Sequence, residues 1–272
     1  MRKVLISAKD LATWLTQDDA PVVLAVRGGP VAPATPRIPG AVDVELPRDL
    51  ASPQSGFSGS RPLPAIAALQ AAARAWGITQ NRAVVLYDHD RCLQAGRGWW
   101  VLTWAGIADV RMLDGGFAAW TGPTATEAPS PAPGDVTLSA GHLPVLDADA
   151  AAAMARAAIL LDTRIRPNYI GGVTAPGQPG RGHIPGSISA PVIDTLTEAG
   201  TVTDPATLRH LYGALGVDGR GQVGVSCGAG VSAALTVALL ASIGIEAAMF
   251  PGSWSAWSAD PARPVAIGGL PG

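Results

Sequence analysis

The chain has 272 residues, of which 48% are hydrophobic and only 15% are charged, and its formal net charge at pH 7 is −2. This length suffices for two domains or one large one, and it excludes a miniature fold that depends on disulfide bonds. Because the charge is nearly balanced and no basic block occurs, the sequence lacks the electrostatic footprint of a nucleic-acid-binding protein and favours small-molecule chemistry.

The chain begins with a short apolar run that follows Arg2 and Lys3. Lys9 and Asp10 interrupt this run before it reaches the length of a signal-peptide core. We therefore expect a cytoplasmic protein.

The first half alternates strand and helix patterns. Short apolar runs, typical of buried parallel strands, occupy residues 22–26, 84–87 and 110–113. Helical patterns lie between them at residues 64–76 and 98–105. This alternation predicts an α/β domain.

Residues 122–144 are rich in proline among Thr, Ser, Ala and Gly, and they show neither helical nor strand periodicity. Such a composition is typical of an extended connector. We therefore predict a first domain over residues 1–121, a Pro-rich linker over residues 122–144 and a second domain over residues 145–272.

The second half repeats the alternation of strands and helices. Apolar runs predict strands at residues 159–162, 223–226 and 247–250, and helical patterns occupy residues 205–215 and 231–243. Each half is thus predicted to hold a mainly parallel sheet flanked by helices. A stretch rich in Gly and Pro at 171–180 is predicted to be an insertion between these elements.

Residues 223–245 contain no charged side chain and are long enough on paper to cross a bilayer. However, several glycines interrupt this stretch, and Val223 and Val225 alternate with small residues as in a buried strand. We therefore predict a strand, a Gly-containing loop and a helix too short to span, and we expect no membrane partner.

Two motifs of the first half recur in the second. Arg37-Ile38-Pro39-Gly40-Ala41 is echoed by residues 183–187, and residues 113–120 are echoed by 250–257, where glycine precedes an aromatic pair. Self-similarity of this kind indicates a tandem duplication.

Cys227 ends a predicted strand, and Gly228-Ala229-Gly230 leads from it into the apolar helix. Backbone N–H groups of such a loop, together with a helix N-terminus, stabilise an anionic sulfur, so one interpretation is a reactive thiolate. The alternative is a buried structural cysteine. A phosphatase loop is disfavoured because Ala233 stands where its phosphate-binding arginine is required.

The chain resembles the two-domain rhodaneses, a family of thiosulfate and 3-mercaptopyruvate sulfurtransferases. The resemblance covers nearly the whole chain and rests on four motifs of the second half: residues 162–164, 182–186, 227–233 and 252–257. In the first half, Asp88 stands at the position of the cysteine. The resemblance therefore implies a catalytically silent first domain and an active second one.

The resemblance also implies a double-displacement reaction. Cys227 would take a sulfur atom from a small anionic donor, form a persulfide, and pass the sulfur to a thiol, a thioredoxin-like protein or cyanide, without a metal or organic cofactor. The loop residues expected to hold the persulfide are Gly228, Ala229, Gly230, Val231 and Ser232. The Ser232 hydroxyl is expected to be a further donor.

The uncharged loop is more similar to that of the mercaptopyruvate enzymes, which favours 3-mercaptopyruvate as donor over thiosulfate. Ala229 and Arg37 replace the serine and the first-domain histidine of the relay proposed for those enzymes, and Asn168 replaces a substrate-binding arginine. The cations that remain as candidates to bind the carboxylate or sulfonate of the donor are Arg37, Arg164, Arg166 and Arg181.

Two other functions stay open at this point. The missing relay residues favour a non-enzymatic module that carries or binds sulfur species. A redox sensor that uses Cys227 together with Cys92, which is expected to be partly exposed, is a third hypothesis. Turnover that disappears in Cys227→Ser would exclude the carrier.

Overall fold

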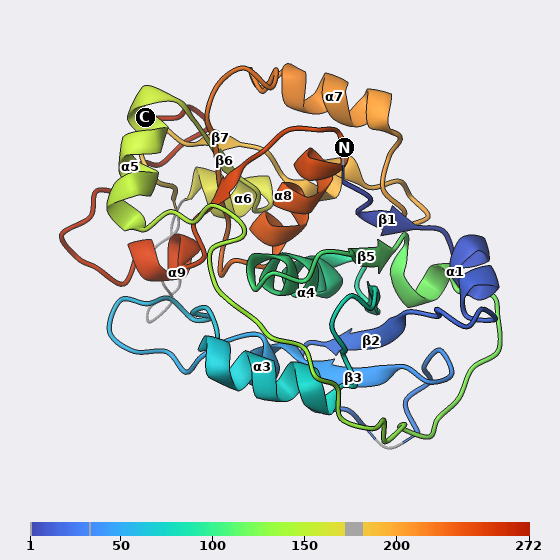
Figure 1. Ribbon diagram of the computed structural model, residues 1–272. Coiled ribbons are helices and arrows are strands. Elements are labelled where there is room, and N and C mark those ends of the chain that lie inside the picture. The colour runs from blue at the N-terminus through green and yellow to red at the C-terminus, as the bar shows by residue number, and fades with distance from the viewer. Residues whose placement is uncertain (1, 33, 172–181) are drawn as a thin grey trace.

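The computed structural model describes residues 2–32, 34–171 and 182–272 and divides into two α/β lobes (Figure 1). Each lobe contains a sheet whose strands are all parallel. The expected tandem α/β fold is therefore confirmed.

The first lobe is built on a five-stranded sheet in the order β1-β5-β4-β2-β3. Its strands are β1 (Leu5–Ile6), β2 (Val22–Arg27), β3 (Val42–Glu45), β4 (Val84–Tyr87) and β5 (Val110–Leu113). Its helices are α1 (Ala8–Trp14), α2 (Leu46–Asp49), α3 (Ile66–Ala75), α4 (Leu93–Trp104) and the 3-10 turn η1 (Gly116–Ala119). Helices α2, α3 and α4 pack on one face of the sheet, and α1 and η1 cover the other face.

The second lobe repeats this plan with a sheet in the order β7-β6-β8-β9. Its strands are β6 (Ile159–Asp162), β7 (Ile188–Ser189), β8 (Val223–Ser226) and β9 (Ala248–Met249). Its helical segments are α5 (Ala148–Ala157), α6 (Arg166–Ile170), η2 (Val192–Thr195), α7 (Pro205–Gly213), α8 (Ser232–Ser242) and α9 (Ser253–Trp257). Val145 bridges Met249 in parallel, as β1 pairs with β5, so both lobes share one strand order.

The predicted strands agree closely with the observed ones, but one predicted helix is wrong at its start. Helix α4 begins at Leu93 rather than at residue 98, because Gly96 and Gly98 lie inside the helix instead of before it. Glycine normally weakens a helix interior. Here it permits close packing: a Cβ atom at Gly96 would lie 2.7 Å from Cβ of Leu235.

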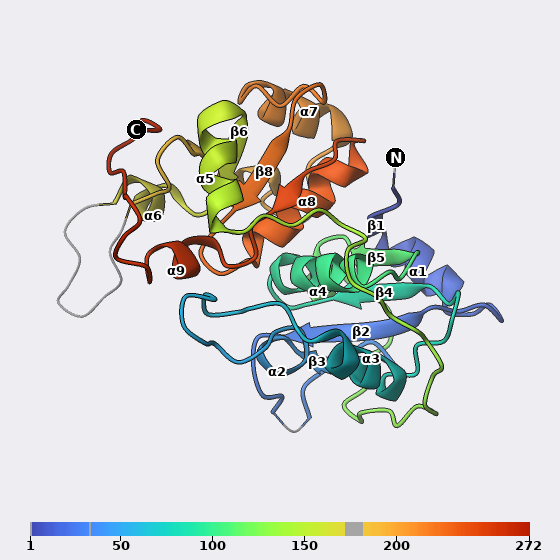
Figure 2. The ribbon, with the colours of Figure 1, turned by 60° about the vertical axis from the view of Figure 1, so that its left-hand side comes forward.

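Helices α4 and α8 pack against each other between the two sheets, as both ribbon views show (Figures 1 and 2). Each follows the strand at the equivalent position of its lobe, β4 or β8. The interior of α8 is buried, which explains why residues 223–245 carry no charge. No helix in the described part of the chain is long and apolar enough to cross a membrane.

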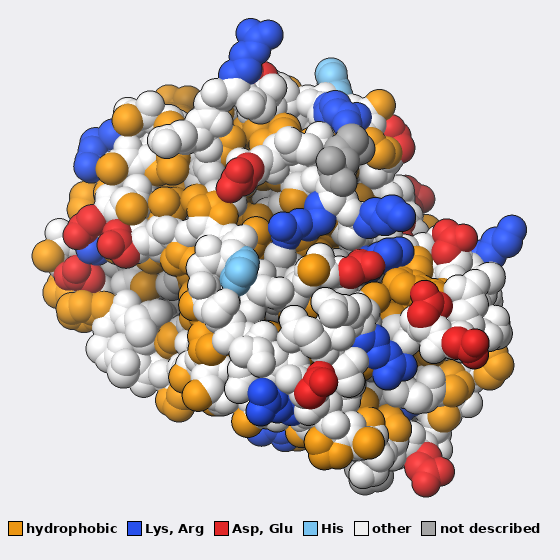
Figure 3. All heavy atoms as spheres, in the orientation of Figure 1, with side chains coloured by type: hydrophobic (Ala, Val, Ile, Leu, Met, Phe, Trp, Pro, Cys, Tyr) orange, Lys and Arg blue, Asp and Glu red, His pale blue; other side chains and the backbone are white. Residues whose placement is uncertain are grey.

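The connecting segment 122–144 runs along the outside of the first lobe before it reaches α5 (Figure 1). Its backbone is held there by hydrogen bonds: Gly134 N–H donates to the Arg74 carbonyl at 2.8 Å, and His142 N–H donates to the Trp104 carbonyl at 3.1 Å. On the face shown in Figure 3, acidic and basic side chains are interspersed, with no large basic patch.

Candidate active site

Cys227 directly follows β8, at the carboxyl edge of the second sheet, and its side chain is buried. The end of the neighbouring strand β6 brings Asp162, Thr163 and Arg164 to the same edge. The carboxyl edge of a parallel sheet is the usual place for chemistry in open α/β folds. The topology thus brings the motifs at residues 162–164 and 227–233 to the same edge of the sheet.

The loop after Cys227 turns back toward its sulfur. Gly230 N–H donates a hydrogen bond to Sγ of Cys227 at 3.0 Å. Gly230 has a φ of +71°, and a Cβ atom there would lie 2.6 Å from the carbonyl oxygen of Pro251. Only glycine fits this position without displacing the neighbouring backbone.

Ser253 is a second neighbour of the sulfur that the sequence did not reveal. Its hydroxyl accepts the N–H of Cys227 at 3.1 Å and lies 3.8 Å from Sγ. The hydroxyl also lies 2.8 Å from the carbonyl oxygen of Phe250, to which it donates. Because a hydroxyl has one proton, Ser253 donates either to this carbonyl or to the sulfur. The signal was the repeated motif at residues 250–257, although that motif alone did not point at Cys227.

Ser253 is also held in an unusual conformation, with a φ of +51°. Non-glycine residues in the left-handed region cost free energy and persist where the surrounding contacts fix them. Here Trp254 N–H donates to the carbonyl of Cys227 at 2.9 Å, and Ser255 N–H donates to that of Gly228 at the same distance. Helix α9 is thus tied to the cysteine loop.

Arg97 of α4 reaches the cysteine loop from the first lobe, and it is fully buried. Its guanidinium donates to the carbonyl of Gly230 at 3.3 Å. It also donates to the carbonyls of Leu50, Arg61 and Pro62, at distances between 3.1 and 3.4 Å. Burial lowers the pKa of Arg97 to about 10, with the nearby Cys227 acting in the opposite direction. The side chain is therefore still a cation at neutral pH.

A cavity of about 500 Å³ lies between the lobes beside the cysteine loop. Its walls come from the loop after β4, from the turn after β6, and from η2 and its flanks. The lining residues are Asp90, Arg91, Leu93, Thr163, Arg164, Ile165, Asn168, Val192, Ile193, Leu196 and Ser232. Within this wall the Ser232 hydroxyl lies 2.9 Å from that of Thr163. Of the expected loop residues, Ser232 is therefore the one whose side chain borders the cavity.

The arginines expected to bind the donor lie in different surroundings in the structure. Arg164 lines the cavity, but its Nε donates to the carboxylate of Asp162 at 2.9 Å, and its guanidinium stacks over Trp254. Arg37 is buried in the first lobe, where Nη2 contacts Asp43 at 2.6 Å. Arg181 lies outside the described residues. The charges of Arg164 and Arg37 are thus neutralised by carboxylates of the fold.

Arg91 is an exposed cation of the cavity wall that the sequence did not single out. The stem of its side chain packs on Gly200 of the second lobe, where a Cβ atom would lie 3.1 Å from Cγ of Arg91. Within the described part of the chain, Arg91 makes no ion pair. Its charge is therefore available to a ligand in the cavity.

In the loop after β4, backbone N–H groups surround the carboxylate of Asp88. Asp88 is fully buried and accepts the N–H groups of Asp90, Cys92 and Ala95 at 2.8 to 2.9 Å. Burial raises the pKa of Asp88, while these three donors oppose the rise. The carboxyl group of Asp88 therefore occupies this loop, and no sulfur nucleophile stands at its position.

The structure contradicts the expectation that Cys92 is partly exposed. Cys92 is fully buried at the start of α4, and its thiol donates to the carbonyl of Leu113 at 3.2 Å. Burial raises the pKa of this thiol well above its usual range. A buried, protonated thiol is a poor redox partner, so the geometry disfavours the redox-sensor hypothesis.

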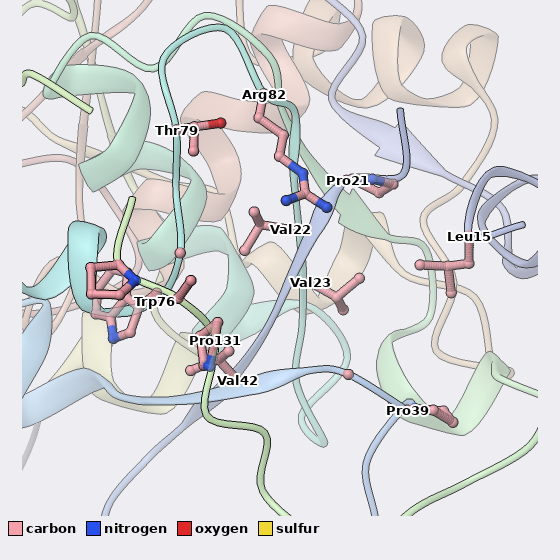
Figure 4. A pocket seen from close by; sticks show the side chains of 14 residues that line it. Leu15, Pro21, Val22, Val23, Pro39, Val42, Trp76, Thr79, Arg82 and Pro131 are labelled. Carbon is pink, nitrogen blue, oxygen red and sulfur yellow. The ribbon is translucent and has the colours of Figure 1, made fainter. Parts of the chain in front are cut away.

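A second cavity, of about 410 Å³, lies at the opposite edge of the first sheet (Figure 4). Val22 and Val42, which begin β2 and β3, line it together with Trp76 and Pro131, and Arg82 reaches toward it. It contains no thiol and no acid. It is therefore separate from the chemistry at the carboxyl edge.

Comparison with known proteins identifies the family of this chain. The profile of the rhodanese-like domain matches the chain twice, over residues 7–123 and 147–260. This chain belongs to the rhodanese family. The repeat of residue motifs and the repeat of strand order therefore reflect two rhodanese-like domains.

Two relatives of this rhodanese cover almost its whole length. A putative thiosulfate sulfurtransferase, SseB, from Mycobacterium tuberculosis is 42% identical over 98% of both chains. A probable 3-mercaptopyruvate sulfurtransferase from Pseudomonas aeruginosa is 37% identical over 97% of this chain and 98% of its own. These relatives confirm the expected enzyme class, a sulfurtransferase.

A solved structure supports the fold. The 3-mercaptopyruvate sulfurtransferase from Leishmania major matches 93% of this chain and 73% of its own, with a TM-score of 0.80 and 23% identity. At this identity the likeness concerns the fold alone.

Proposed function

We propose that this rhodanese transfers a sulfur atom through a persulfide on Cys227, taking it from 3-mercaptopyruvate in preference to thiosulfate and giving it to a thiol, a thioredoxin-like protein or cyanide. The observation that carries the proposal is the hydrogen bond from Gly230 N–H to Sγ of Cys227, at 3.0 Å, in a loop at the carboxyl edge of the sheet. A fixed N–H donor aimed at sulfur stabilises the anion that the reaction needs.

In the first step the Cys227 thiolate attacks the outer sulfur of the donor, and a new S–S bond forms. With 3-mercaptopyruvate the C–S bond breaks, and its electron pair leaves on the enolate of pyruvate, which then takes a proton. With thiosulfate the S–S bond breaks and sulfite leaves. In the second step the acceptor attacks the terminal sulfur, and the Cys227 thiolate leaves unchanged. No external oxidant or reductant enters either step.

The cavity supports a small anionic donor. Its volume of about 500 Å³ and its position beside Ser232 suit a molecule of a few heavy atoms next to the cysteine loop. We propose Arg91 as the cation that binds the carboxylate or sulfonate, in place of Arg37 and Arg164, whose charges are taken by Asp43 and Asp162. The uncharged side chains of the cysteine loop favour 3-mercaptopyruvate.

Intact-protein mass spectrometry tests the proposal. The folded wild type, incubated with either donor, is expected to gain about 32 Da, roughly one sulfur atom, and to lose it when cyanide or a dithiol is added. Cys227→Ser is expected to gain nothing, while Cys92→Ser, the matched control, is expected to behave as the wild type does.

Two results would overturn parts of this proposal. Absence of the adduct from the folded wild type with both donors contradicts a Cys227 persulfide. An adduct that neither cyanide nor a dithiol removes contradicts the transfer step and indicates a carrier module instead. For the donor, kcat/KM is expected to be higher with 3-mercaptopyruvate, and the reverse order contradicts that assignment.

A further inference from the structure

Arg97, a charged residue of the first lobe, contacts the cysteine loop at the carbonyl of Gly230. We propose that Arg97 is a positioning residue that provides the buried counter-charge for the anionic sulfur of Cys227, so that the silent lobe forms part of the catalytic machinery. The proposal rests on the proposed function, because it concerns the same sulfur atom.

The first argument is that Arg97 has no acidic partner in the described part of the chain. Arg97 is fully buried, and each of its hydrogen bonds in the described part of the chain goes to a neutral carbonyl. A buried cation normally requires an opposite charge, because burial without one costs several kcal/mol. No carboxylate of the described residues forms an ion pair with Arg97. The anion that remains is the thiolate or persulfide of Cys227.

The second argument is the shape of the loop. Arg97 donates to the carbonyl of Gly230, and the N–H of Gly230 donates to the sulfur. Nη1 of Arg97 would lie only 2.9 Å from a Cβ atom at Gly230, so the guanidinium packs directly on that residue. One side chain of the first lobe thus holds the residue whose N–H points at Sγ.

The other charged groups around the loop do not replace Arg97. Arg164, whose Cδ lies 4.0 Å from the position of a Cβ at Gly228, is neutralised by Asp162. Arg61 contributes its carbonyl to Arg97, and its own cation opposes a second positive charge nearby. The elements that follow the cysteine, α8 and α9, contain no charged residue. Asp90 and Arg91 belong to the wall of the cavity.

The test uses variants of the full chain that separate the charge of Arg97 from its hydrogen bonds. Arg97→Lys keeps the charge, Arg97→Gln keeps N–H donors without it, and Arg97→Met keeps neither. Arg74→Met is the matched control, because Arg74 also donates to a backbone carbonyl, that of Val136, but in the first lobe on α3. Far-UV circular dichroism selects the folded variants, and Arg97→Gln carries the test if Arg97→Met does not fold.

The readout is alkylation of Cys227 in the folded protein, followed by mass spectrometry over a range of pH. In Arg97→Gln and Arg97→Met we expect alkylation at pH 7 to be about tenfold slower and the rate profile to move to higher pH, since an adjacent opposite charge favours an anion by roughly this factor. We also expect the rate ratio of anionic iodoacetate to neutral iodoacetamide to fall. Arg97→Lys is expected to restore most of both effects, and Arg74→Met to change neither.

A merely structural role predicts a different outcome. In that case the folded Arg97→Gln variant keeps the wild-type pH profile and the wild-type reagent ratio, and this result overturns the proposal. Failure of Arg97→Lys to restore either quantity contradicts it as well. The assay requires no sulfur donor, so its outcome is independent of the persulfide experiment that tests the proposed function.

Discussion

At the scale of single residues, the site depends on which arginines keep a free charge. Arg164 and Arg37 are arginines in motifs, but each contacts a carboxylate that is close in sequence, Asp162 or Asp43. In each pair the carboxylate neutralises an arginine that, from the sequence alone, is a candidate to bind an anionic ligand. Arg91 and Arg97 lack carboxylate partners in the described part of the chain, and both come from the first lobe.

Arg91 gives a prediction for donor binding. Arg91→Gln removes a cation from the cavity wall, so we expect KM for an anionic donor to rise about three- to tenfold with little change in kcat, as for a partly exposed charged contact. Steady-state kinetics at low and at moderate salt measure this, and the effect should shrink with added salt.

Arg220→Gln is the control for this experiment. Arg220 is exposed and lies 3.9 Å from Asp218, so its removal should leave KM unchanged. Equal KM values for Arg91→Gln and the wild type would exclude Arg91 as the donor cation.

At the scale of elements, the packing of α4 on α8 decides where the two loops meet. Gly96 and Gly98 made the first turns of α4 unrecognisable as a helix, although they allow the contact with Leu235 and with the sheet. The cost of glycine in the helix is offset by the close approach of the two helices. The approach also brings Arg97, one residue beyond Gly96, to the cysteine loop.

Gly96→Ala tests this packing. The added methyl group would lie 2.7 Å from Cβ and 2.8 Å from Cα of Leu235, which cannot move aside as a flexible side-chain end can. We expect a loss of about 1–3 kcal/mol in the free energy of unfolding, measured by urea denaturation, together with reduced sulfur transfer.

Gly213→Ala serves as the comparison in α7. No atom lies within 4 Å of a Cβ atom at Gly213, so this variant should be neutral or more stable by up to about 1 kcal/mol. If Gly96→Ala were as stable as Gly213→Ala, the close approach of α4 and α8 would be disproved.

At the scale of the whole molecule, the two lobes share one hydrophobic core. A single buried cluster runs from Val4 and Trp99 in the first lobe to Leu235 and Leu240 in the second. A large apolar interface couples the stabilities of the parts that it joins. The low charge and high apolar content of the sequence therefore serve the contact between the lobes as well as their separate cores.

This shared core predicts a single cooperative transition in urea. Six of the eight tryptophans lie in the first lobe, so tryptophan fluorescence reports mainly that lobe, while far-UV circular dichroism reports helices of both. We expect the two curves to coincide. Two separate midpoints would show that the lobes unfold independently.

The sequence by itself determined the α/β class, the duplication and the cysteine at a strand end, because these follow from local periodicity and short motifs. Short apolar runs place parallel strands, and the residue after such a run lies at the carboxyl edge of the sheet. The elements that it missed are mostly short, such as β1 and β7, and it misplaced the start of α4, which contains glycines.

Only the tertiary structure decided which groups surround the sulfur. Arg97 contacts the carbonyl of a residue 133 positions later in the chain, and Ser253 contacts Cys227 across 26 positions. Cys92 became a buried thiol, and Asp88 filled the loop after β4, through contacts that no local pattern specifies. The charge around a buried sulfur depends on distance through the fold rather than along the chain, and that distance is set by the packing of α4 on α8.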